Sequence, residues 1–568
     1  MTKGPIIDTL ILHHLAEPDL QRHHDLGFAC HDLLVVDAWK EEFRETEDEV
    51  FGRAQSRKDV IEAANREELR IDALKAALAA RRALRGAIPI NKEALKALKK
   101  TFRESRTAWK SAKKRLCRSR AALLAIDDME DSLLEYNGRD AQATANLANS
   151  LFPRTNGAMA RVREVEHQLL PLAITMFEKG MPVDEGARVI LAKELTETMA
   201  SSLETLSRLS EIKWGDGGNE KNPKSPGDRK WLLYDFLSLP VRVRTEKKGE
   251  PATGSDAMLP HLSDPTVKAL FDYDSAHKLF STFVEKLEVD SNGRVHYSWM
   301  VGAQVTGRWS SSPSAQNIHP KVRKIFVAPQ GYVLVGADFA QLEARIIAAL
   351  SQCGAMINAF KRCEDIHSVN AAAIFGEAFS NETNKERRKA LRDLGKMVVH
   401  ASDYGAGAPT ITNNILTDPE VDPIIRGLVT EVRVREILRE FERKFPEVPK
   451  WRLAQERQAR NDGWLSTEPL GRTRVFPRPK DIESTVCFNW PIQSAASDIM
   501  NLSLLKIVER IQPDEEILGN FHDATMVLTR EGRAETVKTI LEESMRGEFF
   551  GVPLAAEAKI AKSWSEVF

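Results

Sequence analysis

The stretch VLVGADFAQLEARIIAALS, residues 333–351, decides the fold of the second half of the chain. Its first part is an apolar run that ends at Asp338, which predicts a buried strand with a carboxylate at its end. The helix that should follow places Leu342, Ile346 and Leu350 on one apolar face. Helices and short strands alternate from here to the C-terminus, so the sequence predicts an α+β protein.

A second acidic residue of the same kind occurs in EILGNFHDATMVL, residues 516–528. His522 and Asp523 fall between two apolar runs, which predicts a β-hairpin with the carboxylate at its tip. A lone strand-end aspartate is most often a helix cap or a turn residue. Two such aspartates brought together would instead meet the minimum requirement of a two-metal phosphoryl-transfer site, with ions about 3.5 to 4 Å apart.

A third pattern lies on a predicted helix, RRKALRDLGKMVVHASDYG, residues 387–405. Arg392, Lys396, His400 and Tyr404 recur every four residues and therefore share one face. Two cations followed by two rings suit a nucleoside triphosphate, with the phosphates near the cations and the base or sugar near the rings. A solvated amphipathic face would give a similar spacing, so this pattern alone leaves both interpretations open.

Seven motifs in a fixed order then become specific. They are TGRWSSSPSAQNIHP (306–320), VGADFAQLEARIIAALS (335–351), EDIHSVNAAAIFG, R-x-x-x-K-x-x-x-H-x-x-x-Y-G, LGRTRVFP, NWPIQSAASDI and FHDA. This series resembles the polymerase region of family A DNA polymerases, the DNA polymerase I type, over about residues 162–568. The resemblance implies a multidomain right hand of palm, fingers and thumb. It also implies a template-directed DNA polymerase that adds dNTPs to a primer 3′-OH by a two-metal mechanism.

The resemblance also implies roles for single residues. Asp338 and Asp523 match the metal-binding catalytic aspartates, with the carbonyl of Phe339 as a further ligand. The implied cofactor is a pair of Mg²⁺ ions, with Mn²⁺ as an alternative. Lys396 would contact the triphosphate and protonate the leaving pyrophosphate, and Glu343 would act as the steric gate against a ribose 2′-OH. The nucleotide-binding set is Gln341, Glu343, His367, Arg392, Lys396, His400 and Tyr404. The set that would contact primer-template DNA is Arg308, Gln316, Asn317, Asn489, Gln493 and His522.

Domain boundaries follow from the same resemblance. The thumb and the entry to the palm would occupy residues 161–300, and the palm and fingers residues 301–568, with the fingers at about 352–480. Residues 1–160 resemble part of a ribonuclease H-like 3′-5′ exonuclease domain with a charged helical insertion at about 41–131. Its segment YNGRDAQATANLA contains Tyr136 and Asp140 in the spacing of a metal-binding motif. Because no D-x-E strand is found upstream, this domain would be vestigial, or a separate polypeptide would carry the missing half.

Charge distribution, cysteine spacing and the length of apolar runs indicate the class and location of the protein. The 568 residues carry a formal net charge of −1, yet residues 81–120 contain 15 basic and 2 acidic side chains, a local net charge of +13. This segment is either a solvated helical hairpin or a DNA-contacting arm. The five cysteines form no C-x-x-C pair, and no apolar run is long enough for a membrane span. We therefore expect a cytoplasmic protein, in the host cytoplasm if it is viral. Its compact domain set resembles bacteriophage enzymes that act in phage DNA replication.

Four positions depart from the family pattern. His400 stands where Phe or Tyr is usual, Ala524 replaces an acid, Thr485 an arginine and Ala401 a glycine. These departures bear on rate, fidelity and sugar discrimination rather than on metal binding. Three other functions stay open at this point: a single-subunit RNA polymerase, a non-catalytic DNA-binding or polymerase subunit of a split polymerase/exonuclease, and a nuclease.

Overall fold

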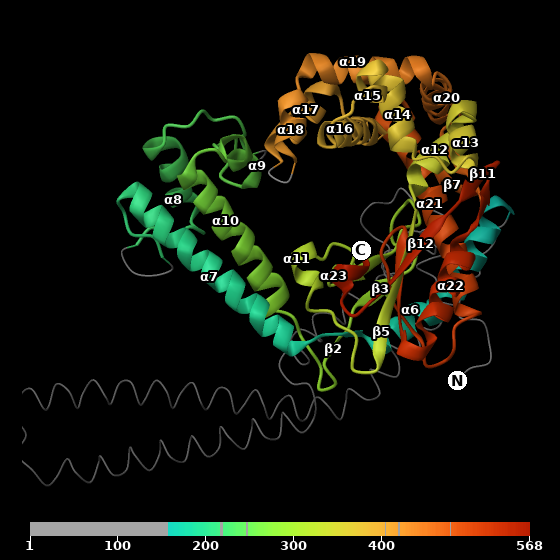
Figure 1. The fold of residues 1–568 in the computed structure, drawn as a ribbon, viewed down its shortest axis with the longest axis horizontal. Coiled ribbons are helices and arrows are strands. Elements are labelled where there is room, and N and C mark those ends of the chain that lie inside the picture. Colours follow the sequence, from blue (N-terminus) through green and yellow to red (C-terminus); the bar gives the residue numbers. More distant parts are fainter. Residues whose placement is uncertain (1–156, 216–219, 246–247, 404, 419–420, 477–478) are drawn as a thin grey trace, which may run out of the picture. The chain divides into compact units, whose positions relative to one another are not determined.

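The computed structural model describes residues 157–568, except 216–219, 246–247, 404, 419–420 and 477–478. The predicted insertion at 41–131, together with Tyr136 and Asp140, lies outside the described residues. Within residues 157–568, helices alternate with short antiparallel strands (Figure 1), which confirms the predicted α+β class.

The largest sheet has four antiparallel strands in the order β12-β5-β9-β8. In chain order they are β5 (Tyr332–Phe339), β8 (Glu516–Asn520), β9 (Ala524–Arg530) and β12 (Ala556–Ala561). β5 is the strand predicted at 333–338, and β8 and β9 are the two arms of the predicted hairpin. β5 and β9 are the two inner strands and are buried over most of their length, which explains why their sequences are apolar runs rather than alternating ones.

Two helices near the C-terminus pack on this sheet. They are α22 (Ala534–Met545) and α23 (Trp564–Val567), and both lie against β12 and β5. A Cβ at Gly336 would stand 2.0 Å from Cγ1 of Val567, so only glycine allows α23 to approach β5 this closely. α23 therefore packs on the strand that carries Asp338.

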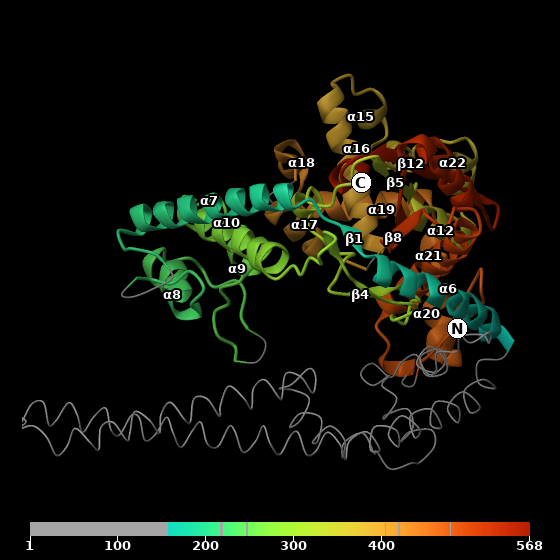
Figure 2. The same cartoon turned by 90° about the horizontal axis from the view of Figure 1, so that it is seen from below.

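Residues 160–285 are mostly helical. Their elements are α6 (Ala160–Lys179), α7 (Glu185–Ser210), α8 (Pro226–Lys230), a π-helical turn (Trp231–Phe236), α9 (Ser255–Met258), a 3-10 turn (Leu259–His261), α10 (Pro265–Leu279) and a second π-helical turn (Phe280–Glu285). α7 and α10 pack side by side (Figures 1 and 2). Each begins at an aspartate whose carboxylate accepts a backbone N–H, Asp184 from Ala187 at 2.7 Å and Asp264 from Thr266 at 2.8 Å. This helical pair lies where the resemblance places the thumb.

Nine helices separate β5 from the next described strand. They are α12 (Leu342–Ser351), α13 (Gly354–Lys361), α14 (Ile366–Phe375), α15 (Glu377–Ser380), α16 (Lys385–Asp403), α17 (Ala408–Thr417), α18 (Pro423–Leu428), α19 (Glu431–Lys444) and α20 (Glu447–Asp462). α14, α16 and α19 pack on one another, so the helix predicted to carry the Arg392 stripe has one packed face and one open face.

The remaining elements connect these groups. They are α11 (Pro320–Arg323), α21 (Ser484–Val508), and four two-stranded sheets: β1 (Met181–Pro182) with β2 (Arg294–Val295), β3 (Ser298–Met300) with β4 (Ser310–Ser312), β6 (Trp464–Thr467) with β7 (Arg472–Val475), and β10 (Gly547–Phe549) with β11 (Val552–Leu554). α21 is buried along most of its length and packs against α6, α12, α20 and α22. Through α22, which packs on β5 and β12, it connects α6, α12 and α20 to the main sheet.

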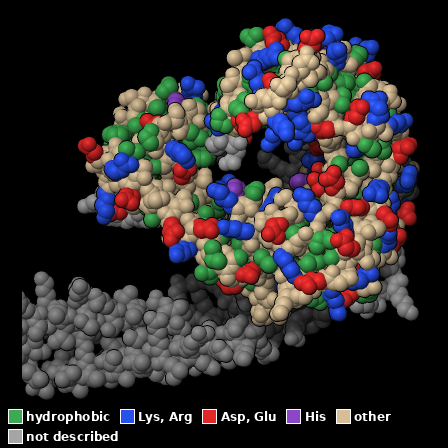
Figure 3. All heavy atoms as spheres, in the orientation of Figure 1, with side chains coloured by type: hydrophobic (Ala, Val, Ile, Leu, Met, Phe, Trp, Pro, Cys, Tyr) green, Lys and Arg blue, Asp and Glu red, His purple; other side chains and the backbone are tan. Residues whose placement is uncertain are grey.

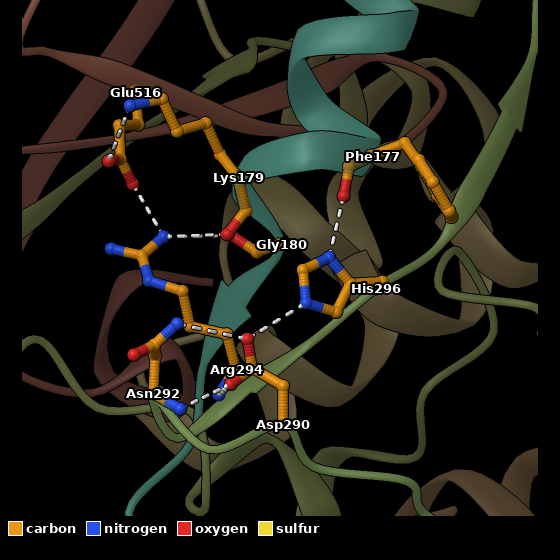
Figure 4. Close-up of polar contacts among 8 residues, drawn as sticks. All are labelled: Phe177, Lys179, Gly180, Asp290, Asn292, Arg294, His296 and Glu516. Carbon is orange, nitrogen blue, oxygen red and sulfur yellow. Dashed lines mark hydrogen bonds and ion pairs between the residues drawn. The ribbon is translucent and has the colours of Figure 1, made fainter.

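A polar junction fixes the C-terminus of α6 (Figure 4). The Arg294 guanidinium donates to the Glu516 carboxylate at 2.6 Å and to the carbonyl of Gly180 at 3.1 Å. The His296 ring contacts the carbonyl of Phe177 at 2.7 Å. Cationic groups at a helix C-terminus are favourable because the last carbonyls carry partial negative charge. The junction ties α6 to β2 and to β8 of the main sheet.

Among the described residues, no helix combines the length and the apolar character that crossing a membrane requires.

Candidate active site

The two strand-borne aspartates lie on neighbouring backbones. Asp338 is next to last in β5, and Asp523 lies in the tight turn between β8 and β9. The register places Asp338 opposite Ala524, and the backbone N–H of Phe339 donates to the carbonyl oxygen of Asp523 at 3.0 Å. The predicted hairpin therefore does bring the second acid to the end of the strand that carries the first.

Acidic neighbours act more strongly on this pair than the nearby Lys559 and Arg308 do. The Asp338 side chain is open to solvent, but partial burial of its carboxyl group and repulsion from Asp523 and Glu557 raise its pKa to about 7. Burial also raises the pKa of Asp523, and the nearby Glu343 carboxylate adds to that shift. Two carboxylates that repel each other at an accessible edge fit divalent cations, which prefer oxygen ligands. The described residues contain no cluster of three or more His, Cys, Asp or Glu that could hold a metal.

Glu343, on the first turn of α12, lies next to this pair. Its carboxylate accepts a hydrogen bond from the Arg308 guanidinium at 3.0 Å, and Nε2 of His400 lies 3.7 Å from its other oxygen. His522, at the hairpin tip, has a lowered pKa because of burial and the nearby Arg308. Four residues that the resemblance assigned separately to nucleotide and to DNA thus form one charged group beside Asp523.

Three residues of the predicted stripe, Arg392, Lys396 and His400, are described on α16. Lys396 and His400 are exposed, and Tyr404 lies outside the described residues. Burial lowers the pKa of His367, on the neighbouring helix α14, to about 4, and the charge of Lys396 adds to this shift. Figure 3 shows Lys and Arg side chains gathered over α16. The arrangement offers an anion a cationic surface beside the aspartate pair.

Arg392 has a partner that the sequence patterns did not reveal. Its Nε and Nη2 donate to the two oxygens of Asp365 at 2.6 and 3.0 Å, and Gln341 donates to the same carboxylate at 2.9 Å. These contacts lower the pKa of Asp365 despite its partial burial. Asp365 also caps α14 by accepting from the Ser368 N–H at 3.1 Å. Its place just before a helix was the only available signal, and that signal predicts a cap rather than a partner for Arg392.

The other residues expected to contact DNA lie on two elements. Gln316 and Asn317 are in the loop after β4, where Gln316 accepts from Ser311 at 2.7 Å and Asn317 donates to Ser314 at 3.1 Å. Asn489 and Gln493, one helical turn apart, are half-exposed on the otherwise buried helix α21. Their partial exposure on a largely buried helix leaves these two polar side chains accessible to a ligand.

Two of the residues that depart from the family pattern, Ala524 and Thr485, lie against elements that carry site residues. Ala524 is buried beside Asp338 in the β5–β9 register. Gly405 has φ +81°, and a Cβ there would lie 2.1 Å from Cγ2 of Thr485. The turn after α16 therefore closes directly onto the position where an arginine is usual.

Comparisons with known proteins agree with this geometry. The profile of DNA polymerase family A matches residues 191–566. DNA polymerase I of Pseudomonas aeruginosa is 30% identical over 459 residues, which are 76% of this chain and 47% of that protein. The thermostable DNA polymerase I of Thermus aquaticus is 28% identical over 454 residues, covering 76% of this chain and 51% of that one. The chain thus spans about half the length of these curated relatives.

A solved structure shares the fold. It is the polymerase domain of Pol1 from M. smegmatis in complex with DNA primer-template and dNTP. It is 21% identical with a TM-score of 0.65, and the match covers 98% of this chain and 82% of that one.

Proposed function

The chain belongs to DNA polymerase family A, and from that premise we propose that it is a template-directed DNA polymerase that adds dNTPs to a primer 3′-OH. The observation that carries this proposal is the juxtaposition of Asp338 and Asp523, which Glu343 links to the cationic helix α16 through its contact with His400. The two aspartates would hold metal ions, and the cationic side chains would hold a triphosphate. The M. smegmatis relative, solved with primer-template and dNTP, supports the same pair of substrates here.

Asp338 and Asp523 would hold the metal, together with the carbonyl of Phe339. Two bound Mg²⁺ ions, or Mn²⁺ in their place, would activate the attacking oxygen and stabilise the leaving group. The aspartates must be ionised to bind them, and their mutual repulsion is the term that a cation relieves.

The cations of α16 would orient and neutralise the triphosphate. Lys396 is exposed and would reach the phosphates as a mobile point charge and protonate the departing pyrophosphate. Arg392 is held by Asp365, so it would offer only the rest of its donor set unless the pair opens. Positioning and electrostatics of this kind supply most of the catalysis in phosphoryl transfer.

Glu343 would select the sugar. Its carboxylate is half-buried and fixed by Arg308, so it would leave little room for a 2′-OH, which favours dNTPs over rNTPs and disfavours an RNA polymerase. The presence of both aspartates and of Lys396 disfavours a non-catalytic subunit. Basic residues of the thumb would hold the duplex through its phosphates, without reading sequence.

Several finer parts of the proposal rest on sequence alone. The phage role, the cytoplasmic location and the domain boundaries stay predictions. Tyr136 and Asp140, to which we assign the exonuclease role, lie outside the described residues. A separate polypeptide that completes the exonuclease stays a prediction as well. Degradation of a 3′-labelled single strand by this chain alone would test the nuclease.

Primer extension tests the main proposal. Asp338→Ala should abolish extension of a primed template in the presence of Mg²⁺, and chelation by EDTA should abolish it in the wild type. Asp514→Ala is the matched control, because Asp514 is an exposed acid just before β8 of the same hairpin and forms an ion pair with Arg530 at 3.2 Å. If Asp338→Ala extends at the wild-type rate, the site assignment is wrong.

A further inference from the structure

A buried group of charges lies outside the site described above. The Arg472 guanidinium, 2% exposed, donates from Nη2 to Glu166 at 2.6 Å and to Asp498 at 2.7 Å, and from Nε to Asp498 at 3.1 Å. Both carboxylates are 0% exposed. We call these three residues, which come from β7, α6 and α21, the buried triad. It joins three segments that are far apart in the chain.

The loop that precedes β4 is shaped against the buried triad. Gly302 has φ +61°, and a Cβ there would lie 2.8 Å from the Glu166 carboxylate. Gly307 has φ +77°, and a Cβ there would lie 2.4 Å from Cζ of Arg472. Glycine is required at both positions by the backbone conformation and by the close approach of a charged group. Both ends of the loop therefore depend on where the triad places its carboxylate and its guanidinium.

The residue after Gly307 is Arg308. The backbone of this loop is closed by Gly307 N–H donating to the Gln304 carbonyl at 2.7 Å, and Val305 accepts from the Trp490 indole at 2.7 Å. Arg308 then leaves the loop and holds the Glu343 carboxylate at 3.0 Å. A displacement of Gly307 would therefore move the guanidinium that fixes the proposed sugar gate.

Stability alone is a poor explanation for the triad. Buried ion groups are often no more stabilising than apolar side chains of the same volume, because desolvation offsets their attraction. Here the buried atoms Oε2 of Glu166, Oδ2 of Asp498 and Oγ1 of Thr306 have no hydrogen-bond partner among the described residues, which adds to the cost. An arrangement that is costly but geometrically specific fits a positioning role better.

We propose that Glu166, Arg472 and Asp498 are positioning residues for Arg308, and through it for selection of the nucleotide sugar by Glu343. The inference rests on the proposed polymerase function. None of the three touches the substrates. Their effect passes through the shape of the loop from Gly302 to Gly307.

The test is a double-mutant cycle. Asp498→Asn and Glu166→Gln keep side-chain shape and are each made in the wild type and in Arg308→Ala. Single-turnover kcat/KM for a dNTP should fall about tenfold in the wild-type background but less than about twofold when Arg308 is already absent. In the Asp498→Asn and Glu166→Gln variants the ratio of dNTP to rNTP incorporation should also fall, but not when the same changes are made in Arg308→Ala.

The control is Glu515→Gln. Glu515 is a buried carboxylate, 7% exposed, that accepts from Thr529 at 3.1 Å and from Arg533 at 3.1 Å at the end of β9 away from Asp523. Its loss should lower the melting temperature without changing the dNTP to rNTP ratio. Equal losses from the triad variants in both backgrounds, or wild-type selectivity in every triad variant that folds, would overturn the proposal. A wild-type protein that fails to extend a primer would instead overturn the proposed function.

Discussion

Two groups of carboxylates in this molecule are arranged in opposite ways. Asp338 and Asp523 are accessible at a sheet edge, and the charges that act most on Asp338 are acidic, from Asp523 and Glu557. In the buried triad, two carboxylates with no solvent access share the guanidinium of Arg472. Carboxylates whose strongest charged neighbours are acidic are tolerated only where solvent or an ion can reach them. The first arrangement suits a ligand, and the second suits a fixed structure.

The largest effect should follow from neutralising the accessible pair. Asp523→Asn keeps the side-chain shape but removes a charge that the metal ions require, so primer extension should fall by at least about 10³-fold. Affinity for primer-template DNA, measured by fluorescence anisotropy, should stay within a few-fold. Asp514→Asn is the control on the same hairpin. An extension rate within tenfold of the wild type would show that Asp523 is not a metal ligand.

Removing the guanidinium from the buried triad should chiefly destabilise the fold. Arg472→Met leaves two buried carboxylates without their cation, which costs about 3–5 kcal/mol. Urea denaturation followed by circular dichroism measures this loss. Arg472→Met/Asp498→Leu/Glu166→Leu removes all three charges and should recover most of the stability but not the activity. A stable, fully active triple variant would contradict the positioning role.

The contrast also shows how far the sequence alone could lead. β5 and the β8–β9 hairpin were predictable because apolar runs interrupted by turn residues are local signals. That Asp338 and Asp523 meet was only a hypothesis from these patterns, because the pairing of β5 with β9 is not local, and the family resemblance is what implied it. Arg472 contacts Glu166 across 306 positions of the chain. Neither GRTR nor REVEH shows that pairing, because it depends on how β7 and α6 come together in the fold. The pairing of Arg392 with Asp365 escaped prediction for the same reason.

In burial and in charged neighbours, Glu343 is intermediate between the accessible pair and the buried triad. It is half-exposed and has Arg308 and His400 beside it. His400→Phe removes one polar ring next to the proposed sugar gate. The His400 ring lies 3.7 Å from Glu343, and because a partly exposed charge pair of this kind contributes only about 0.2–1 kcal/mol, we expect use of dideoxynucleotides relative to dNTPs to change by up to about fivefold. His400→Tyr, which keeps a polar ring, should stay closer to the wild type. The ratio is measured by competitive chain termination, and unchanged ratios in both variants would exclude a role for His400.

The smallest effect should be on the pH dependence of stability. Burial raises the pKa of Asp498 to about 6 even though Arg472 opposes the shift, whereas an unfolded aspartate titrates near 3.9. Between these values the folded state binds more protons than the unfolded state, so this group makes the protein less stable as the pH rises from about 4 to 6. The Asp498→Asn variant lacks this titrating group, so the free energy of unfolding of the variant should rise relative to that of the wild type as the pH increases across this interval.

Urea titrations of both proteins at several pH values would show the change, with Glu515→Gln as the control for losing a buried carboxylate. If the free energies of unfolding of the wild type and Asp498→Asn differ by a constant amount across this interval, Asp498 stays ionised there. Its attraction to Arg472 would then outweigh its burial.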